Sequence, residues 1–171
     1  MEPGFLDCGA QLLAIKAATL TNPQERVIVL ELYEVHIKKN IYHSGRDQII
    51  GPNGKANVLL RGSFKNFKIP IWYKVDTKME KKELNEIITK LDDISYHVIC
   101  ITMENGGDNV SLASSLGVDP DQPYFQHPTR EGVKVFFLFD PVHLHKLMRN
   151  HISEKGFFLK SGVINHWQRT I

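Results

Sequence analysis

The order of β-rich and helical segments constrains the fold of this chain more than any other feature of its sequence. A nearly all-apolar run at 97–103 is typical of a strand buried on both faces of a sheet, and helical segments flank it. Four β-rich runs joined by hairpin-length connections precede it, at 26–37, 41–50, 56–60 and 67–75. A meander followed by β-α-β units predicts one mixed β-sheet with helices on its faces.

Capping residues and apolar periodicity predict four helices. Residues 5–20 form the first, and 110–116 form another that ends at Gly117. Thr77 and Glu80 make a capping box before the most regular apolar repeat, and Asp140 caps the last helix, which starts with proline. Apolar residues recur at the spacing of amphipathic helices in three of these segments: Leu12, Leu13, Ile15 and Leu20; Leu84, Ile87, Ile88 and Leu91; Leu144, Leu147, Met148 and Ile152.

Three further features refine the predicted sheet. Pro70 lies inside a β-rich run and cannot donate a ladder hydrogen bond, which indicates an edge position or a bulge. Residues 133–139 predict a last core strand, and 157–167 predict a short β-like segment with a turn at Ser161 and Gly162.

Composition limits the classes of protein to which the chain can belong. Its 171 residues suffice for one domain with a proper core, and there is no apolar run of eighteen residues that could span a membrane. The start of the sequence lacks the basic leader of a secretory signal, and two distant cysteines, Cys8 and Cys100, favour a reducing, intracellular compartment. A net charge of +2 permits nucleic-acid binding without arguing for it.

Four stretches resemble, in order, the P element transposase family, which includes the THAP-type transposases. The segment 3–5 resembles the lead-in to the catalytic core, 32–38 the first acidic strand and 102–109 the second acidic turn. The block 140–150 is the most specific match, because Asp, His, Leu, Lys, Arg and Asn occur in the family's order. The resemblance implies an α/β, RNase H-like mixed β-sheet flanked by helices over residues 1–135. Residues 136–171 would then begin a truncated GTP-binding insertion domain.

In that family, carboxylates from the first strand, the fourth strand and a later helix hold Mg²⁺ or Mn²⁺ ions for phosphoryl transfer. Tyr33 replaces the expected first Asp, and a phenol with a pKa of about 10 is a poor ligand for magnesium. Glu34 remains beside it but points to the opposite face of the strand, whereas Glu31 shares the face of Tyr33 two residues away. The second acid position carries Glu104, which could keep weak metal binding or could cap the next helix. The third acid would lie beyond residue 171.

The block 140–150 has two interpretations. The resemblance implies that Asp140, Lys146 and Asn150 contact nucleotide in a GTP site that is incomplete here. The alternative is an amphipathic helix with an Asp cap and a basic outer face. His143 and His145 are two residues apart on this helix, which is the wrong geometry for one metal ion.

The sequence therefore supports a leading hypothesis and two alternatives. The leading hypothesis is a truncated or domesticated nuclear transposase remnant that lacks a full acidic triad, does not cleave DNA by itself, and retains weak DNA contact or protein contacts. The first alternative is a fragment of an active metal-dependent DNA transposase that uses Glu31 or Glu34. The second is a plain protein-interaction module.

Overall fold

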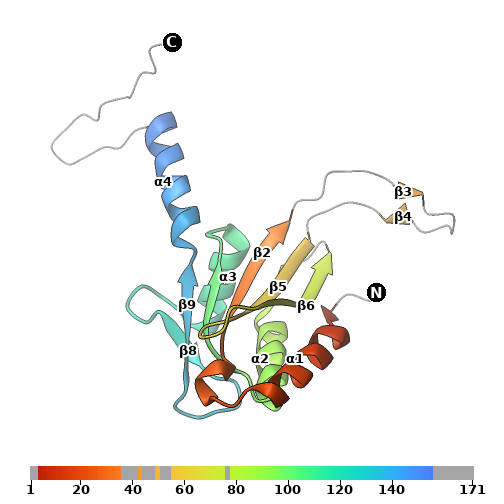
Figure 1. Ribbon diagram of the computed structural model, residues 1–171. Coiled ribbons are helices and arrows are strands. Elements are labelled where there is room, and N and C mark those ends of the chain that lie inside the picture. Colours follow the sequence, from red (N-terminus) through yellow and green to blue (C-terminus); the bar gives the residue numbers. More distant parts are fainter. Residues whose placement is uncertain (1–3, 36–41, 44–48, 51–54, 76–77, 156–171) are drawn as a thin grey trace.

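A computed structural model describes residues 4–35, 42–43, 49–50, 55–75 and 78–155 of the chain (Figure 1). Its main feature is a seven-stranded mixed sheet with the order β1-β6-β5-β2-β7-β9-β8. The strand bounds are β1 Gly4–Phe5, β2 Val27–Val35, β5 Lys55–Gly62, β6 Lys68–Val75, β7 His97–Met103, β8 Tyr124–Gln126 and β9 Lys134–Phe139.

The pairing of the strands confirms the predicted meander followed by parallel units. β2, β5 and β6 pair antiparallel in succession, whereas β7 pairs parallel with both β2 and β9. The short β8 pairs antiparallel with β9 and was not predicted, since three residues give too little periodicity. The expected domain boundary after residue 135 falls inside β9, whose pairing with β7 keeps residues up to Phe139 in the sheet.

The described residues of the β-rich run at 41–50 pair outside this sheet. Tyr42–His43 (β3) and Ile49–Ile50 (β4) pair with each other as a separate two-stranded sheet. The turn expected at 44–47, the loop at 51–54 and the β-like segment at 157–167 lie outside the described residues.

Pro70 lies at the predicted irregularity in β6. The register between β5 and β6 shifts so that Leu59 faces Pro70 while Val58 faces Trp72, which leaves Ile71 as the extra residue of a bulge. The carbonyl oxygen of Ile71 instead accepts a hydrogen bond from the backbone N–H of Leu6, at 2.7 Å. The bulge therefore ties the start of the chain to the sheet.

Four α-helices and one 3-10 turn accompany the strands. They are α1 Asp7–Thr19, η1 Pro23–Arg26, α2 Lys81–Asp93, α3 Gly107–Leu116 and α4 Pro141–Lys155. Gly117 ends α3 in the left-handed conformation, as predicted. The predicted cap of α2 was wrong, because Glu80 is the N-cap and forms the capping box with Glu83, whose carboxylate accepts the Glu80 N–H at 3.1 Å. No described helix is long and apolar enough to cross a membrane.

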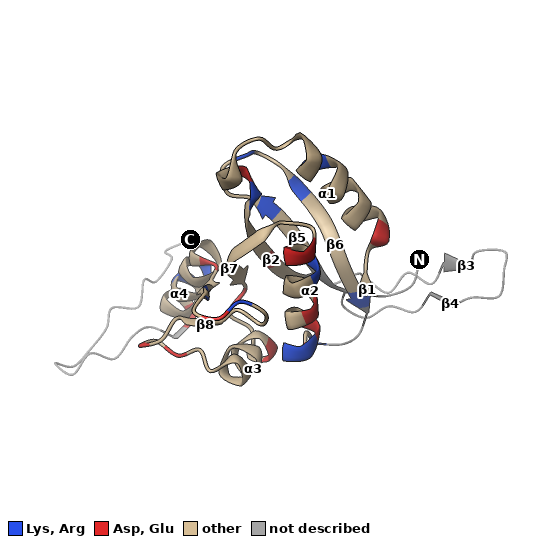
Figure 2. Ribbon diagram, turned by 90° about the horizontal axis from the view of Figure 1, so that it is seen from below, with Lys and Arg blue, Asp and Glu red and all other residues tan. Residues whose placement is uncertain are grey.

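In the described part of the chain, the hydrophobic core lies on one face of the sheet. Alternate strand residues such as Leu30, Leu60 and Ile101 are fully buried, and they form one cluster with residues of α1, α2 and α3. Residues that point the other way, such as Phe136 and Leu138, are 46% and 49% exposed. Within the described residues, α1, α2 and α3 therefore cover one face of the sheet and leave the other open (Figure 2).

Two helices bury less than their sequences predict. Leu13 in α1 and Leu20 at its C-cap are buried, but Leu12 and Ile15 are exposed. The helix packs closely through a small residue, since a Cβ added at Gly9 would lie 2.7 Å from the carbonyl oxygen of Pro70. Leu12 and Ile15 therefore do not share the buried face of the expected amphipathic helix.

Helix α4 rises from the end of β9 and points away from the sheet (Figure 1). Three of the apolar residues expected to line one face of this helix, Leu144, Leu147 and Met148, are 38–51% exposed. Amphipathic spacing indicates a face that can pack but does not supply a partner.

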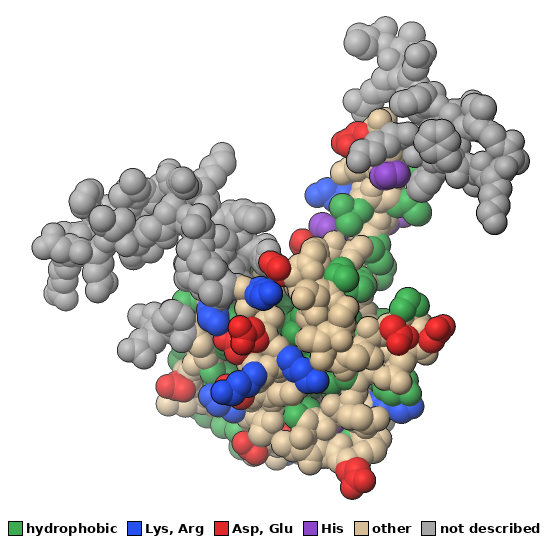
Figure 3. Space-filling model, turned by 180° about the vertical axis from the view of Figure 1, so that it is seen from behind, with side chains coloured by type: hydrophobic (Ala, Val, Ile, Leu, Met, Phe, Trp, Pro, Cys, Tyr) green, Lys and Arg blue, Asp and Glu red, His purple; other side chains and the backbone are tan. Residues whose placement is uncertain are grey.

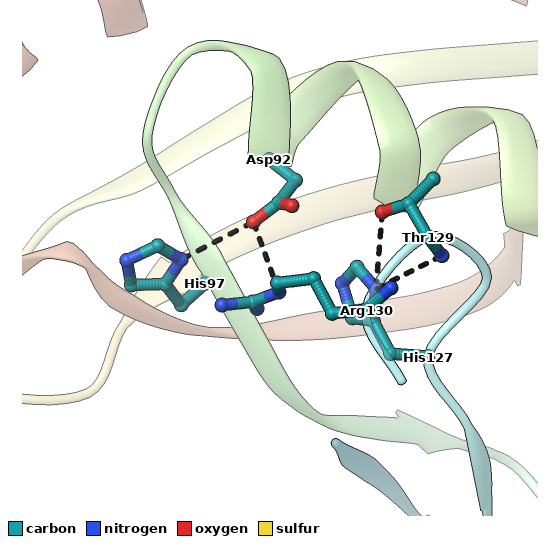
Figure 4. A network of polar contacts seen from close by, with 5 residues as sticks. All are labelled: Asp92, His97, His127, Thr129 and Arg130. Atoms are coloured by element: carbon teal, nitrogen blue, oxygen red, sulfur yellow. Dashed lines mark hydrogen bonds and ion pairs between the residues drawn. The ribbon is translucent and has the colours of Figure 1, made fainter. Parts of the chain in front are cut away.

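A polar cluster fastens the β8–β9 loop to the end of α2 (Figure 4). Nδ1 of the buried His127 accepts hydrogen bonds from the backbone N–H groups of Thr129 and Arg130, at 3.3 and 3.2 Å. The carboxylate of Asp92 lies 3.3 Å from Nδ1 of His97 and 3.4 Å from Nε of Arg130. Burial, together with the Arg130 charge, lowers the pKa of His127. A neutral His127 therefore acts here as a hydrogen-bond acceptor.

Candidate active site

The open face of the sheet contains a cavity of about 1090 Å³. Its walls come from β2, β7, the residue that follows β9, and the connection between β5 and β6, which are distant in sequence. The residues lining it are Val29, Glu31, Leu32, Tyr33, Arg61, Gly62, Ser63, Phe64, Lys65, Asn66, Thr102, Met103, Glu104 and Asp140. The cavity extends to the carboxyl ends of the three parallel strands, the usual place for a site in such sheets.

Strand register brings three of the predicted site residues to one end of this cavity. Leu32 is paired with Met103, and Met103 with Phe139, so that the next residues are Tyr33, Glu104 and Asp140. The backbone N–H of Asp140 also donates to the carbonyl oxygen of Met103 at 2.8 Å. All three side chains belong to the lining of the cavity.

Glu104 presents its carboxylate to this end of the cavity. Its own carbonyl oxygen accepts hydrogen bonds from the Asn109 side chain and from the Gly106 N–H, each at 2.9 Å, which holds the backbone in the turn before α3. The N-cap of α3 is Gly106, and no side chain caps this helix. The carboxylate of Glu104 is 46% exposed and lies 3.8 Å from Nδ1 of His143. The alternative in which Glu104 caps α3 is therefore wrong.

Asp140 caps α4, and this hydrogen bonding uses one of its carboxylate oxygens. Its Oδ1 accepts the Val142 N–H at 2.9 Å, and its carbonyl oxygen accepts the Leu144 N–H, also at 2.9 Å. These bonds confirm the predicted cap of α4. Lys146 and Asn150 lie further along α4, outside the lining of the cavity, and the Asn150 side chain accepts a hydrogen bond from Arg149 at 3.2 Å.

Glu31 is poorly placed to replace the missing metal ligand, because two basic side chains pair with its carboxylate. Arg61 Nη1 lies 3.2 Å from one of its carboxylate oxygens, and Lys68 Nζ lies 2.5 Å from the other. A divalent cation would have to displace both positive charges or bind beside them. The side chain of Glu34 lies outside the described set, and its backbone pairs with Ala56.

These residues do not fit a pair of divalent cations. Such ions need several oxygen ligands, and two-metal sites share carboxylates between ions about 3.5–4 Å apart. At the strand ends, Tyr33 supplies a phenol, Asp140 caps a helix, and Glu104 contributes a carboxylate. Among the residues that the structure describes, no three His, Cys, Asp or Glu side chains come together as a metal-binding group.

One part of the cavity was missed by sequence reasoning. The connection between β5 and β6 contributes Phe64 and Lys65, and β5 contributes Arg61. The sequence signal was present as the alternation of basic and aromatic residues over 61–68. Because hairpin turns commonly carry polar and exposed residues, that signal did not distinguish a binding surface from an ordinary turn.

Comparisons with known proteins agree with this fold. The model of the family described as TNP-like, RNase H N-terminal domain matches residues 1–117. The P transposase of Drosophila melanogaster is 33% identical over 116 residues, which cover 67% of this chain and 15% of that protein. The human DNA transposase THAP9 is 28% identical over 130 residues, which cover 70% of this chain and 14% of that protein.

A solved structure, the Drosophila P element transposase strand transfer complex, also matches with a TM-score of 0.79 at 27% identity. The match covers 92% of this chain and 36% of that one. The family model, the two relatives and this structural match therefore point to the same family. The chain therefore belongs to the TNP-like family, of which it carries the RNase H N-terminal domain, and it has the RNase H-like fold of a P element-type transposase.

Proposed function

We propose that this chain is a transposase-derived DNA-binding domain that does not cleave DNA by itself. The observation that carries the proposal is the alignment of Tyr33 with Glu104 and Asp140 at the ends of three parallel strands. The position in the first strand that faces the site holds a phenol, which does not replace a carboxylate as a ligand for Mg²⁺ or Mn²⁺.

The setting of the other carboxylates supports this proposal. Glu31 is engaged by two cations, and Asp140 caps α4, which leaves Glu104 as the carboxylate best placed to bind an ion from the cavity. A single carboxylate binds Mg²⁺ weakly, because this ion keeps most of its water unless several oxygen ligands replace it. We therefore assign Glu104 a weak metal-binding capacity and Tyr33 no catalytic role.

A nicking assay tests the proposal. Supercoiled plasmid is incubated with the full chain in Mn²⁺ or Mg²⁺, and relaxed circles are measured on a gel. We expect no nicking above buffer. Metal-dependent nicking that disappears in Glu104→Gln, but persists in the control Glu131→Gln on the exposed β8–β9 turn, would overturn it. Binding of duplex DNA that weakens steadily with added salt is the second expected result.

The main alternative is a fragment of an active transposase. The chain spans about 15% of the P transposase and 14% of THAP9, so the activity of a whole protein can depend on parts that this chain does not contain. In that case Glu31 or Glu34 would replace the missing acid. Adding residues of a relative beyond the matched region should then restore nicking, and Glu31→Gln should abolish it.

The finer parts of the proposal follow from the resemblance. Residues 136–171 would begin a GTP-binding insertion, to which Asp140, Lys146 and Asn150 would contribute, and the protein would act in the nucleus. A fluorescent GTP analogue should bind the isolated chain weakly or not at all, because the site would be incomplete. A protein-interaction role is the third candidate, and the absence of any salt-dependent DNA binding would favour it.

A further inference from the structure

The β8–β9 loop, residues 127–133, is closed by its own backbone and by one histidine side chain. The N–H of His127 donates to the carbonyl oxygen of Val133 at 2.8 Å, and the N–H of Val133 donates to that of Arg130 at 3.4 Å. Inside the loop, Nδ1 of His127 accepts the N–H groups of Thr129 and Arg130, at 3.3 and 3.2 Å. The closed loop therefore depends on an unprotonated nitrogen at this position.

The ring of His127 is buried, in contrast to the histidines on α4. His127 is 5% exposed, whereas histidine side chains on α4 lie at the surface, as Figure 3 shows. The second ring nitrogen of His127, Nε2, is buried and has no hydrogen-bond partner among the described residues. Because a neutral imidazole has one N–H and one acceptor, the N–H groups that point at Nδ1 place the ring proton on Nε2.

The charged and titratable groups that face His127 come from three elements (Figure 4). Arg130 belongs to the loop itself, Asp92 lies near the end of α2, and His97 begins β7. The Asp92 carboxylate lies 3.4 Å from Nε of Arg130 and 3.3 Å from Nδ1 of His97, so its negative charge is already paired. A proton on His127 would therefore add a positive charge beside that of Arg130 without a free carboxylate to balance it.

A second proton on the ring is incompatible with the closed loop. It would occupy Nδ1, at which two backbone N–H groups point, and donors do not bond to one another. These N–H groups would lose their acceptor, and the added charge would lie on a buried ring. The loop can avoid both costs by turning the ring out to water, since β8 has three residues and lies at the edge of the sheet beside β9.

We propose that the β8–β9 loop is a pH-sensitive switch: protonation of His127 opens the loop and releases Arg130 from the end of α2, while the rest of the sheet stays folded. The closed loop is favoured above a pH of about 6.5, the ordinary pKa of an exposed histidine. Below that pH the open loop binds a proton that the closed loop resists, so the open conformation gains population as the pH falls.

Hydrogen exchange measured by NMR on the full chain tests the switch between about pH 7.5 and about pH 5. Protection factors, which correct for the intrinsic effect of pH on exchange, are compared among amides. Those of Thr129 and Arg130 should fall by up to about tenfold per pH unit below about 6.5, because opening takes up one proton. Those of Gly117 and Val118, which donate to carbonyl oxygens of α3 at 3.0 Å, should stay constant.

His127→Asn separates the proton from the hydrogen bonds. The carboxamide oxygen of asparagine is bonded to Cγ, as Nδ1 of histidine is, and it accepts nearby backbone N–H groups in turns without titrating. The loop should therefore stay closed, with protection at Thr129 and Arg130 that does not depend on pH. His97→Asn is the matched control, since His97 contacts Asp92 rather than the loop backbone, and it should keep the pH dependence of the unchanged chain.

Constant protection at Thr129 and Arg130 over this pH range in the unchanged chain would overturn the proposal. An equal loss at Gly117 and Val118 would also overturn it, because it would show global unfolding, as would a pH dependence that survives in His127→Asn. If that variant does not fold, the unchanged chain still decides the matter. Its long-range hydrogen–nitrogen NMR spectra at neutral pH should show the His127 ring proton on Nε2, and a proton on Nδ1 would refute the switch.

Discussion

A substitution at Gly62 tests the tertiary structure directly, because Gly62 is tightly packed in the β5–β6 hairpin turn, residues 62–67. A Cβ added there would lie 2.3 Å from the carbonyl oxygen of Lys65 and 2.4 Å from the ring of Phe67. Neither neighbour moves easily, since the oxygen belongs to the backbone of a hydrogen-bonded turn and the ring is packed against Tyr96. Gly62→Ala must therefore displace the turn or the ring.

The cost of this displacement follows from overpacking, which destabilises proteins by about 1–3 kcal/mol. For a chain of this size each kcal/mol lowers the melting temperature by about 2–4 °C, so Gly62→Ala should melt about 2–12 °C lower. Circular dichroism melting and urea titration measure the change. Gly107→Ala is the matched control, because nothing lies within 4 Å of its added Cβ at the start of α3, and it should be neutral or stabilising. A Gly62→Ala variant with an unchanged urea midpoint would refute the reasoning.

Two further predictions concern buried polar groups. Burial and the Arg130 charge lower the pKa of His127, so below a pH of about 6.5 the unfolded chain takes up a proton that the folded chain resists. The contribution of His127 to stability should therefore be constant above that pH and fall as the pH falls below it. The pH dependence of the urea midpoint should be weaker in His127→Gln and unchanged in the exposed control His145→Gln. Tyr96 is fully buried, and its hydroxyl donates to the carbonyl oxygen of Leu13 at 3.2 Å, so Tyr96→Phe should lose about 0.5–1.5 kcal/mol. An unchanged free energy of unfolding in urea would show that this bond does not hold α1 to the sheet.

Much of the fold was predictable because its signals are local. The helical repeat of Leu84, Ile87, Ile88 and Leu91 indicates one buried face, and all four residues are buried. Pro70 indicated the bulge because proline cannot donate to a ladder. The Thr77 cap was wrong because Glu80 and Glu83 satisfy the same capping pattern three residues later, and the pattern alone does not choose between them.

The site was predictable in part, because strand order can place residues at one end of a sheet. Tyr33, Glu104 and Asp140 were identified from motifs, and the register brings them to one cavity. The surroundings of Glu31 were not predictable, because its partner Arg61 is thirty residues away in sequence. The exposure of Phe64 was not predictable either, since two phenylalanines lie three residues apart and only the fold shows that Phe67 packs against the core while Phe64 is exposed.

The sequence by itself determined the order of the elements, the family resemblance and the presence of a tyrosine where that resemblance implies an acid. These properties lie in neighbouring residues, whose spacing sets helix and strand periodicity. Only the tertiary structure decided that, among the described residues, one face of the sheet is left open by the helices. It also decided that Arg61 and Lys68 form ion pairs with Glu31, and that Phe64 of the β5–β6 hairpin turn lines the cavity. The physical reason is that burial and ion pairing depend on which distant segments meet, and strand register and helix packing settle those meetings.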